Sequence, residues 1–347
     1  MNGQDCNLSI SVAVCTYNGE TFIRKQIQSI LEQSVPVDEI IICDDGSLDN
    51  TLTVAESILC DSSVKYKIEK NSPNVGVTKN FEKCIALCSG DLIFTADQDD
   101  IWKADKVEKM RRAFLEDESC VMAFSDANIV DAAGKEIMPS LYKKDGFLQG
   151  DFSYQKYIDE ILRLNYTVYG CTMVFRRDFI FGIMPFVESA ANHDAWIMCC
   201  AGFFGNVTYV SEQLISYRIH GSNQVGSISG NKKWDSIIYQ QDEFDRYFAI
   251  QSLRDIRIRL IDMALKRNPD IHNKYARQCY LARSFYEVII SLKKMSPVFR
   301  ILRLSGTLLN GSYRYRFCDR NRKFTFGAMI KMIPYDIIFL LKWKNEK

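Results

Sequence analysis

Short apolar runs alternate with longer amphipathic segments over about the first hundred residues of the chain. The runs that predict strands are residues 8–14, 40–43, 64–69 and 92–94. Apolar side chains at helical spacing predict helices between them, at residues 20–33, 49–60 and 76–88. Strands that alternate with helices join through right-handed crossovers into a parallel sheet. The pattern therefore predicts a doubly wound, mostly parallel α/β domain.

Polar residues follow three of these predicted strands. The segments are Cys15-Thr16-Tyr17-Asn18-Gly19, Asp44-Asp45-Gly46-Ser47 and Asp97-Gln98-Asp99-Asp100. Ligands of a doubly wound sheet bind at the carboxyl ends of its strands, so we expect these segments to form one site. Neither a GxGxxG turn nor a Walker lysine loop follows the first strand, which argues against a dinucleotide dehydrogenase and a P-loop NTPase.

The third of these segments packs three carboxylates into the four residues from Asp97 to Asp100. Carboxylates this close repel one another unless a cation lies among them. Hard oxygen ligands on a short turn suit Mg²⁺ or Mn²⁺ beside a substrate diphosphate. The alternative is a solvated acidic turn, because a short motif often arises by chance.

Composition is that of a folded intracellular protein. With 347 residues, 47% of them hydrophobic, the chain can bury a large core, and we expect one large domain with an appendage. Its 12 cysteines are scattered, and the polar residues 1–7 do not resemble a secretory segment, which favours a reducing cytosol over a disulfide framework. No cysteine pair has zinc-finger spacing, so all are interpreted as core or surface residues.

The net charge of +1 conceals an asymmetry along the chain. Residues 293–347 hold 13 Lys or Arg against 3 Asp or Glu, a balance of +10, which leaves −9 for residues 1–292. A basic tail on an acidic body indicates an anionic partner, either nucleic acid or the cytoplasmic face of a membrane.

The four motifs together resemble the family 2 inverting glycosyltransferases, which have a GT-A fold. They are Thr16-Tyr17-Asn18-Gly19, Asp44-Asp45-Gly46-Ser47 with Asp49 and Thr51, Asn74-x-Gly76, and Asp97-x-Asp99. The resemblance continues through residues 193–196 and 217–223, which are similar to a bacterial rhamnosyltransferase-like branch. It implies a catalytic domain at residues 1–230, with a nucleotide-sugar half at about 8–102 and an acceptor half at about 103–230.

On the donor side, the resemblance implies that Thr16, Tyr17 and Asn18 bind the nucleotide sugar, with Tyr17 stacked on the base. Of the next pair, it suggests Asp45 for the base and leaves Asp44 as a second candidate for the ribose. The alternatives are a half-buried core tyrosine and an ordinary turn that leads into a helix cap.

The same resemblance assigns different roles to Asp97 and Asp99 in the acidic segment. Asp97 would reach the ribose or the water shell of the metal, and Asp99 would bind Mg²⁺ or Mn²⁺ directly beside the diphosphate. The metal would offset charge that develops on the departing diphosphate. Asp100 lies beyond the motif and is predicted to cap a helix that starts near Trp102.

Inversion requires a base that deprotonates the acceptor hydroxyl, and Asp194 is the candidate. It stands at the start of an apolar helix, so a simple N-capping role is the alternative. His193 and Trp196 beside it are assigned to orienting the base or contacting the acceptor. His193 departs from the Glu-Asp pair that many relatives carry, which leaves its role open.

Four further residues complete the candidate set. His220, in the segment Tyr217-Arg218-Ile219-His220, could join the metal shell or touch the diphosphate, and Arg218 could neutralise the same phosphates. A surface-loop histidine is the alternative for His220. Lys79 and Asn80 lie on the polar side of a predicted helix and are candidates for diphosphate contact, with a solvated helix face as the other explanation.

The part of the chain beyond the resemblance, residues 231–347, is predicted to be helical and basic. Residues 232–294 have the pattern of two long helices. The run 326–341 is interrupted by Lys331, Pro334 and Asp336, so it falls short of the roughly 18 apolar residues of a spanning helix and would lie on a bilayer. A helix docked on the body is the alternative.

These observations favour a metal-dependent inverting glycosyltransferase that acts on a surface polysaccharide such as O-antigen or capsule. Its donor would be dTDP-rhamnose or a UDP-hexose, and its acceptor a glycan or lipid-linked glycan at the cytoplasmic face of a bacterial inner membrane. A nucleotidyltransferase would need a glycine-rich loop with a basic residue after the first strand, which is absent. A nucleic-acid-binding module is disfavoured by the acidic body, so no nucleic-acid partner is expected.

Overall fold

A computed structural model describes residues 8–144, 152–153, 157, 161, 168–186 and 192–221, with isolated positions between 280 and 307. Residues 1–144, 148–154 and 167–227 form one compact unit, and residues 145–147, 155–166 and 228–347 form a second. Most of the second unit, including the predicted long helices and the run at 326–341, lies outside the described residues. The predicted domain boundary near residue 230 therefore stays a prediction.

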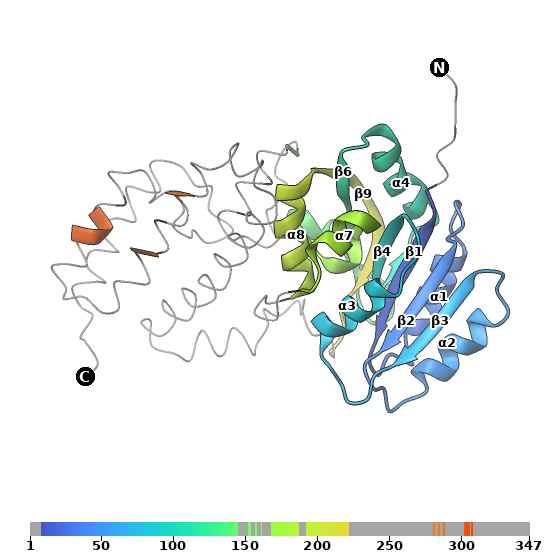
Figure 1. The fold of residues 1–347 in the computed structure, drawn as a ribbon. Coiled ribbons are helices and arrows are strands. Elements are labelled where there is room, and N and C mark those ends of the chain that lie inside the picture. The colour runs from blue at the N-terminus through green and yellow to red at the C-terminus, as the bar shows by residue number, and fades with distance from the viewer. Residues whose placement is uncertain are drawn as a thin grey trace, which may run out of the picture. The chain divides into compact units, whose positions relative to one another are not determined.

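A sheet of nine strands, counted over the described residues, forms the centre of the first unit, and one half of it is fully parallel (Figure 1). Four neighbouring strands make up this half, in the order β3 (Lys65–Lys70), β2 (Glu39–Asp44), β1 (Ile10–Thr16) and β4 (Leu92–Asp97). All four were predicted from the apolar pattern, and the α/β fold is confirmed.

The second half of the sheet mixes strand directions. β8 (Met173–Arg176) runs antiparallel between β4 and β6 (Cys120–Val130). Beyond β6 lies β9 (Asn206–Arg218), which is parallel to β6, while the short β7 (Glu136–Met138) pairs antiparallel with β6. β9 also holds the two-residue β5 (Ile101–Trp102) in an antiparallel pair, which brings the end of β9 to the residues that follow β4.

Helices cover both faces of the sheet. α1 (Ile23–Leu31), α2 (Thr51–Leu59) and α4 (Lys106–Glu116) share one hydrophobic cluster with side chains of β1, β2 and β4. α3 (Val77–Ala86) returns the chain from β3 to β4 in the opposite direction, so a right-handed crossover places it on the other face. There it contacts α8 (His193–Phe204), which also packs on α7 (Arg177–Ile183). The remaining helical pieces are α5 (Leu141–Lys144) and the turn η1 (Gly170–Thr172).

The helix predicted near Trp102 begins later than expected. α4 starts at Lys106, and its N-cap residue is Asp105. Asp100 instead leads into β5, because Ile101 and Trp102 pair with Ser216 and Ile215 of β9. The prediction that Asp100 caps a helix is therefore wrong, since a long-range strand pair takes up the residues that follow it.

The cysteines of the described segments are all free thiols, and Cys60 alone among these is exposed. This agrees with their interpretation as core and surface residues. Within those same segments, no helix combines the length and the hydropathy needed to cross a bilayer.

Candidate active site

The polar segments meet where the strand order changes direction, between β1 and its neighbours β2 and β4. In the parallel register, Thr16 pairs with Asp44 and Cys15 pairs with Asp97, so the three segments leave the sheet at the same level. The backbone therefore brings the three segments together at one edge of the sheet, while their forming a ligand site stays a prediction.

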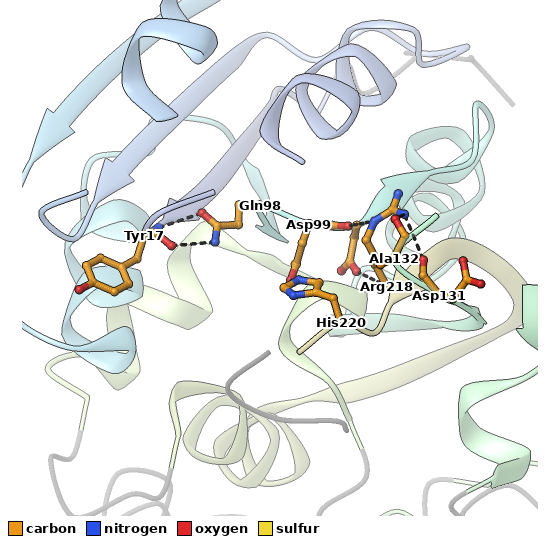
Figure 2. A network of polar contacts seen from close by, with 8 residues as sticks. Tyr17, Gln98, Asp99, Asp131, Ala132, Arg218 and His220 are labelled. Atoms are coloured by element: carbon orange, nitrogen blue, oxygen red, sulfur yellow. Dashed lines mark hydrogen bonds and ion pairs between the residues drawn. The ribbon is translucent and has the colours of Figure 1, made fainter. Parts of the chain in front are cut away.

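Gln98 joins the first segment to the acidic one (Figure 2). The Tyr17 N–H donates to Gln98 Oε1 at 2.9 Å, and Gln98 Nε2 donates to the Tyr17 carbonyl at 2.9 Å. A Cβ at Gly19 would lie 2.0 Å from Gln98 Oε1, so this close approach requires glycine. The Tyr17 ring stays 44% exposed and is free to take a planar ligand. The sequence analysis had given Gln98 no role.

Thr16 and Asp44 are engaged within the protein. The fully buried Asp44 carboxylate accepts hydrogen bonds from Thr16 Oγ1 (2.8 Å), the Gly46 N–H (3.2 Å), the Ser47 N–H (2.8 Å) and Ser47 Oγ (2.5 Å). Four donors fill the acceptor capacity of a carboxylate. Both side chains therefore shape the turn after β2, and we leave them out of the proposed donor contacts.

Asp45 organises the loop that leads into α3. Its Oδ1 accepts from Asn71 Nδ2 at 3.0 Å and from the Val75 N–H at 2.8 Å, and its Oδ2 accepts from the Gly76 N–H at 2.9 Å. Gly76 has φ +84°, a conformation that favours glycine. Three donors leave one acceptor site on the carboxylate, so a contact with the base stays a prediction for Asp45.

Asn18, Lys79 and Asn80 occupy different environments. Asn18 adopts φ 50°, and its Oδ1 accepts the Leu48 N–H at 2.9 Å, which fixes the first segment to the second. Asn80 is buried; its Nδ2 donates to the Cys43 carbonyl at 2.8 Å, and its Oδ1 accepts from Asn71 Nδ2 at 2.8 Å. Asn80 therefore anchors α3 on β2. Lys79 lies 3.1 Å from Glu82 on the same helix and is 39% exposed.

Asp99 and His220, the two predicted metal ligands, lie together although they are 121 residues apart in sequence. His220 Nε2 is 2.8 Å from Asp99 Oδ2, and the imidazole stacks on Phe22 with ring centroids 4.5 Å apart. Both side chains are mostly buried: 11% of the His220 side chain and 14% of the Asp99 side chain are exposed. A carboxylate oxygen beside an imidazole nitrogen is a donor set that fits Mn²⁺, with Mg²⁺ favouring the oxygen alone.

Arg218 faces inward rather than toward a ligand. It is 2% exposed; its Nε donates to the Asp99 carbonyl at 2.8 Å, and its Nη1 donates to the carbonyls of Asp131 (3.2 Å) and Ala132 (3.0 Å). Figure 2 shows this guanidinium turned away from His220. The residue therefore holds the acidic segment against the loop after β6, and we leave it out of the proposed phosphate contacts.

A second acidic group lies deeper, with ligand atoms of Asp97, Asp100 and Cys171 within 4.8 Å of one another. The buried ammonium of Lys106 acts on all three, and burial lowers the pKa of Lys106 to about 7. Burial also raises the pKa of Asp100 well above its ordinary value, with the carboxylates of Asp99 and Asp97 adding to the rise. Because a lysine already supplies positive charge and a thiol is a poor ligand for a hard cation, Asp99 and His220 fit the metal better.

Asp97 is influenced both by Asp194, the candidate base, and by Asp99, a candidate metal ligand. Burial, Asp99 and Asp194 together raise the pKa of Asp97 to about 7. Asp194 therefore lies close enough for its charge to be felt at the acidic segment, although it belongs to a different part of the sheet. The structure brings the candidate base and the candidate metal ligand to the same carboxylate.

Asp194 lies in the first turn of α8, one residue inside the helix, and Asn192 is the N-cap. Its Oδ1 accepts the Ala195 N–H at 2.7 Å. Burial raises the pKa of Asp194 to about 6, and backbone hydrogen bonds from Ala195 and Gly170 oppose that rise. A carboxylate with such a pKa is suited to general base chemistry near neutral pH.

His193 and Trp196 are packed into the protein. His193 is 6% exposed and stacks on Phe81 with centroids 3.9 Å apart, and neither ring nitrogen has a hydrogen-bond partner. Trp196 is fully buried, and its Nε1 donates to the Ile183 carbonyl at 3.0 Å. Trp196 therefore orients α8 against α7 and does not reach an acceptor.

The sequence analysis assigned no role to Lys106, although its place in the apolar pattern of α4 indicates a buried lysine. Val107, Met110, Ala113 and Phe114 form the buried face of α4, and Lys106 falls on the same face. A lysine at an apolar position of an amphipathic helix predicts a buried charge that needs a partner.

Comparison with known proteins finds glycosyltransferases among the relatives of this chain. Residues 11–181 match the family model described as Glycosyl transferase family 2. A dTDP-rhamnosyl transferase, RfbG of Shigella flexneri, is 27% identical over 309 residues, which are 84% of this chain and 98% of that protein. An uncharacterized glycosyltransferase of Nostoc is 28% identical over 62% of this chain and 66% of its own length.

Among solved structures, Staphylococcus aureus TarS 1–349 in complex with UDP-GlcNAc has a similar fold. The TM-score is 0.52 at 16% sequence identity, covering 89% of this chain and 90% of that one. This likeness concerns the fold, an α/β sheet with helices on both faces. The part of the chain that matches the family model, residues 11–181, is just under half of its length.

We expect His193 to make stability depend on pH. Its ordinary pKa is 6.5, and burial lowers the pKa to about 3 in the folded protein, so between these values the unfolded chain binds a proton that the folded chain does not. Stability should fall as pH drops below about 6.5, by about 2 kcal/mol at pH 5. When the free energy of unfolding is measured by denaturant between pH 7 and 5, His193→Leu should lose less of it than the wild type. If the free energy fell equally with pH in both proteins, His193 would not be the source of the pH dependence.

Proposed function

We propose that the protein is a metal-dependent inverting glycosyltransferase that moves a sugar from a nucleotide diphosphate to a hydroxyl of a glycan. The observation that carries the proposal is that Asp194 lies near the end of β4: Gly170 approaches Asp194 and accepts a hydrogen bond from Thr95 of β4, and the charges of Asp194 and Asp99 both act on Asp97. Asp99 with His220 supplies the metal ligands, and Asp194 supplies the base. An inverting transfer needs these two functions close together but on different elements.

The donor is bound by residues at the ends of β1, β2 and β4. The exposed Tyr17 ring stacks on the nucleobase, Asp45 accepts a hydrogen bond from it, and Asp97 reaches the ribose. Lys79 stands near the diphosphate as a weak additional contact. A divalent cation held by Asp99 and His220 would stabilise the negative charge that grows on the leaving diphosphate.

Asp194 accepts the proton of the acceptor hydroxyl as that oxygen attacks the anomeric carbon. The bond from this carbon to the diphosphate oxygen breaks, and the configuration at the carbon inverts. The raised pKa of about 6 leaves Asp194 ionised at neutral pH while keeping it basic enough to take the proton.

We further propose dTDP-rhamnose as the donor, with a UDP-hexose as the second choice. The Shigella relative is named a dTDP-rhamnosyl transferase, and the match extends over 98% of its length. TarS was crystallised with UDP-GlcNAc, which keeps uridine donors open for this fold. A surface polysaccharide or its lipid-linked precursor is the proposed acceptor.

The protein is proposed to act at the cytoplasmic face of a bacterial inner membrane, without crossing it. The +10 balance of residues 293–347 supports this proposal, because anionic lipid attracts basic segments at about 1 kcal/mol for each Lys or Arg near the surface. A lipid-linked acceptor would then meet an enzyme already held at the bilayer.

Asp194→Asn should reduce transfer by about 10²-fold or more, because the amide cannot accept the hydroxyl proton. Binding of the nucleotide diphosphate, measured by thermal shift with Mn²⁺, should remain. The wild-type kcat should fall as pH drops through about 6, since protonation removes the base. Asp178→Asn, an exposed acid in the first turn of α7, is the matched control. Equal loss of binding and transfer would indicate a structural role for Asp194.

Asp99→Ala should lower the affinity for Mn²⁺ by more than about tenfold. The thermal shift that Mn²⁺ produces in the presence of dTDP or UDP should become correspondingly smaller. His220→Ala should reduce it as well, because the two side chains share the proposed site. Screening dTDP, UDP and their sugars with the wild type would identify the base. An unchanged metal dependence in both variants would reject the metal assignment.

Full-length protein should float with vesicles that contain anionic lipid and should stay in solution with neutral phosphatidylcholine vesicles. Raising the salt from about 0.1 M to 1 M should release it, because screening shortens the reach of the charges from about 10 Å to 3 Å. Equal partitioning to both vesicle types would remove the electrostatic basis for the membrane proposal.

A further inference from the structure

Lys106 is a buried cation whose contacts come from several elements of the site. Its side chain is fully buried at the start of α4. Nζ donates a hydrogen bond to the Cys171 carbonyl of η1 at 3.0 Å. The same ammonium lies 3.9 Å from the ring centroid of Trp102, which belongs to β5, and 5.9 Å from that of Phe94 in β4.

Packing alone does not account for this residue. Burying an ammonium costs several kcal/mol before its partners compensate, whereas a methionine of similar length fills the same space at no such cost. Lys109, one turn later on α4, reaches solvent-exposed carboxylates of Asp105 and Glu212 instead. The direction of the Lys106 side chain is therefore specific to its position under the acidic segment.

η1, on one side of Lys106, forms the support of the candidate base. The Gly170 backbone hydrogen bonds to Asp194, and a Cβ on Gly170 would lie 3.7 Å from the Asp194 Cβ and 2.7 Å from His193 Nε2. Thr95 Oγ1 of β4 donates to the Gly170 carbonyl at 2.6 Å. A shift of η1 would therefore move the Asp194 carboxylate with it.

The end of β4, on the other side of Lys106, carries the acidic segment. The charges of Asp100 and Asp97 act on the ammonium, and Asp97 is two residues from the candidate metal ligand Asp99. Asp100 is held from elsewhere through Oδ1, which accepts the Arg218 N–H at 3.0 Å. Lys106 thus joins the turn that would hold the donor diphosphate to the turn that supports the base.

We propose that Lys106 is a positioning residue that fixes the distance between the acidic segment and Asp194, and so aligns the acceptor hydroxyl with the anomeric carbon of the bound donor. This inference rests on the proposed function. A displacement of about 1 Å between reacting groups lowers turnover by about 10²-fold. Donor binding should change little, because the contacts proposed for the base, Tyr17 and Asp45, lie at the ends of β1 and β2 and not on the segment that Lys106 holds.

The test compares Lys106→Met, Lys106→Gln and the matched control Lys103→Met. Lys103 is exposed and lies three residues earlier in the chain. Steady-state transfer gives kcat and the donor KM, and thermal unfolding gives the folded fraction. Lys106→Met should lose about 10²-fold in kcat with little change in donor KM. Lys106→Gln should recover part of kcat, because its amide can donate to the Cys171 carbonyl. Lys103→Met should match the wild type.

Each other result overturns the inference. A kcat for folded Lys106→Met within about twofold of the wild type would show that alignment does not depend on the ammonium. A rise in donor KM at constant kcat would assign Lys106 to donor binding. Unfolding of both Lys106 variants, with Lys103→Met folded, would assign it to stability. If wild-type protein and Lys103→Met transfer no sugar from any nucleotide donor, the proposed function itself fails, independently of Lys106.

Discussion

The structure of the site depends on how one buried strand end accommodates crowded carboxylates. Asp97 ends β4, Asp99 and Asp100 follow it directly, and each of the three has a partner from another element. Asp99 contacts His220, Asp100 accepts the backbone N–H of Arg218, and Lys106 places a positive charge beside Asp97 and Asp100. These partners come from β9 and α4, so elements that follow β4 in the chain are needed to complete the end of β4.

The motif residues divide into those that build the site and those that face a ligand. Thr16, Asp44 and Asn80 use their polar atoms within the protein. Tyr17 remains exposed at the same level of the sheet. A polar motif at a strand end is thus a small structure in itself, in which several buried donors and acceptors hold a few ligand-facing groups in place.

The sequence allowed the nucleotide half to be predicted because its signals are local. Strands β1, β2 and β4 are short apolar runs, β3 alternates polar and apolar residues, and α1 to α3 carry helical spacing. The order of elements and the level of the motifs therefore followed from general rules. The pairing of β5 with β9 could not be predicted, since it joins Trp102 to Ile215 across more than a hundred residues. That pairing displaced the expected helix start and left Asp100 without a capping role. The inward direction of Arg218 and the role of Gln98 are also products of long-range packing, which periodicity does not encode. The basic residues beyond 307 lie outside the described part of the chain, so their predicted role at a membrane stays a prediction.

The three hydrogen bonds that Asp45 accepts from the loop at residues 71–76 also restrict how such a domain can diverge. A mutation of Asp45 would release Asn71, Val75 and Gly76 together and so would disrupt the start of α3. Leu48 and Val75 are neighbours of this network in sequence but are 92% and 45% exposed. Substitutions of these two side chains would change the exposed surface of the loop without removing the Asp45 carboxylate. The loop therefore combines one buried position that fixes its backbone with exposed positions that do not.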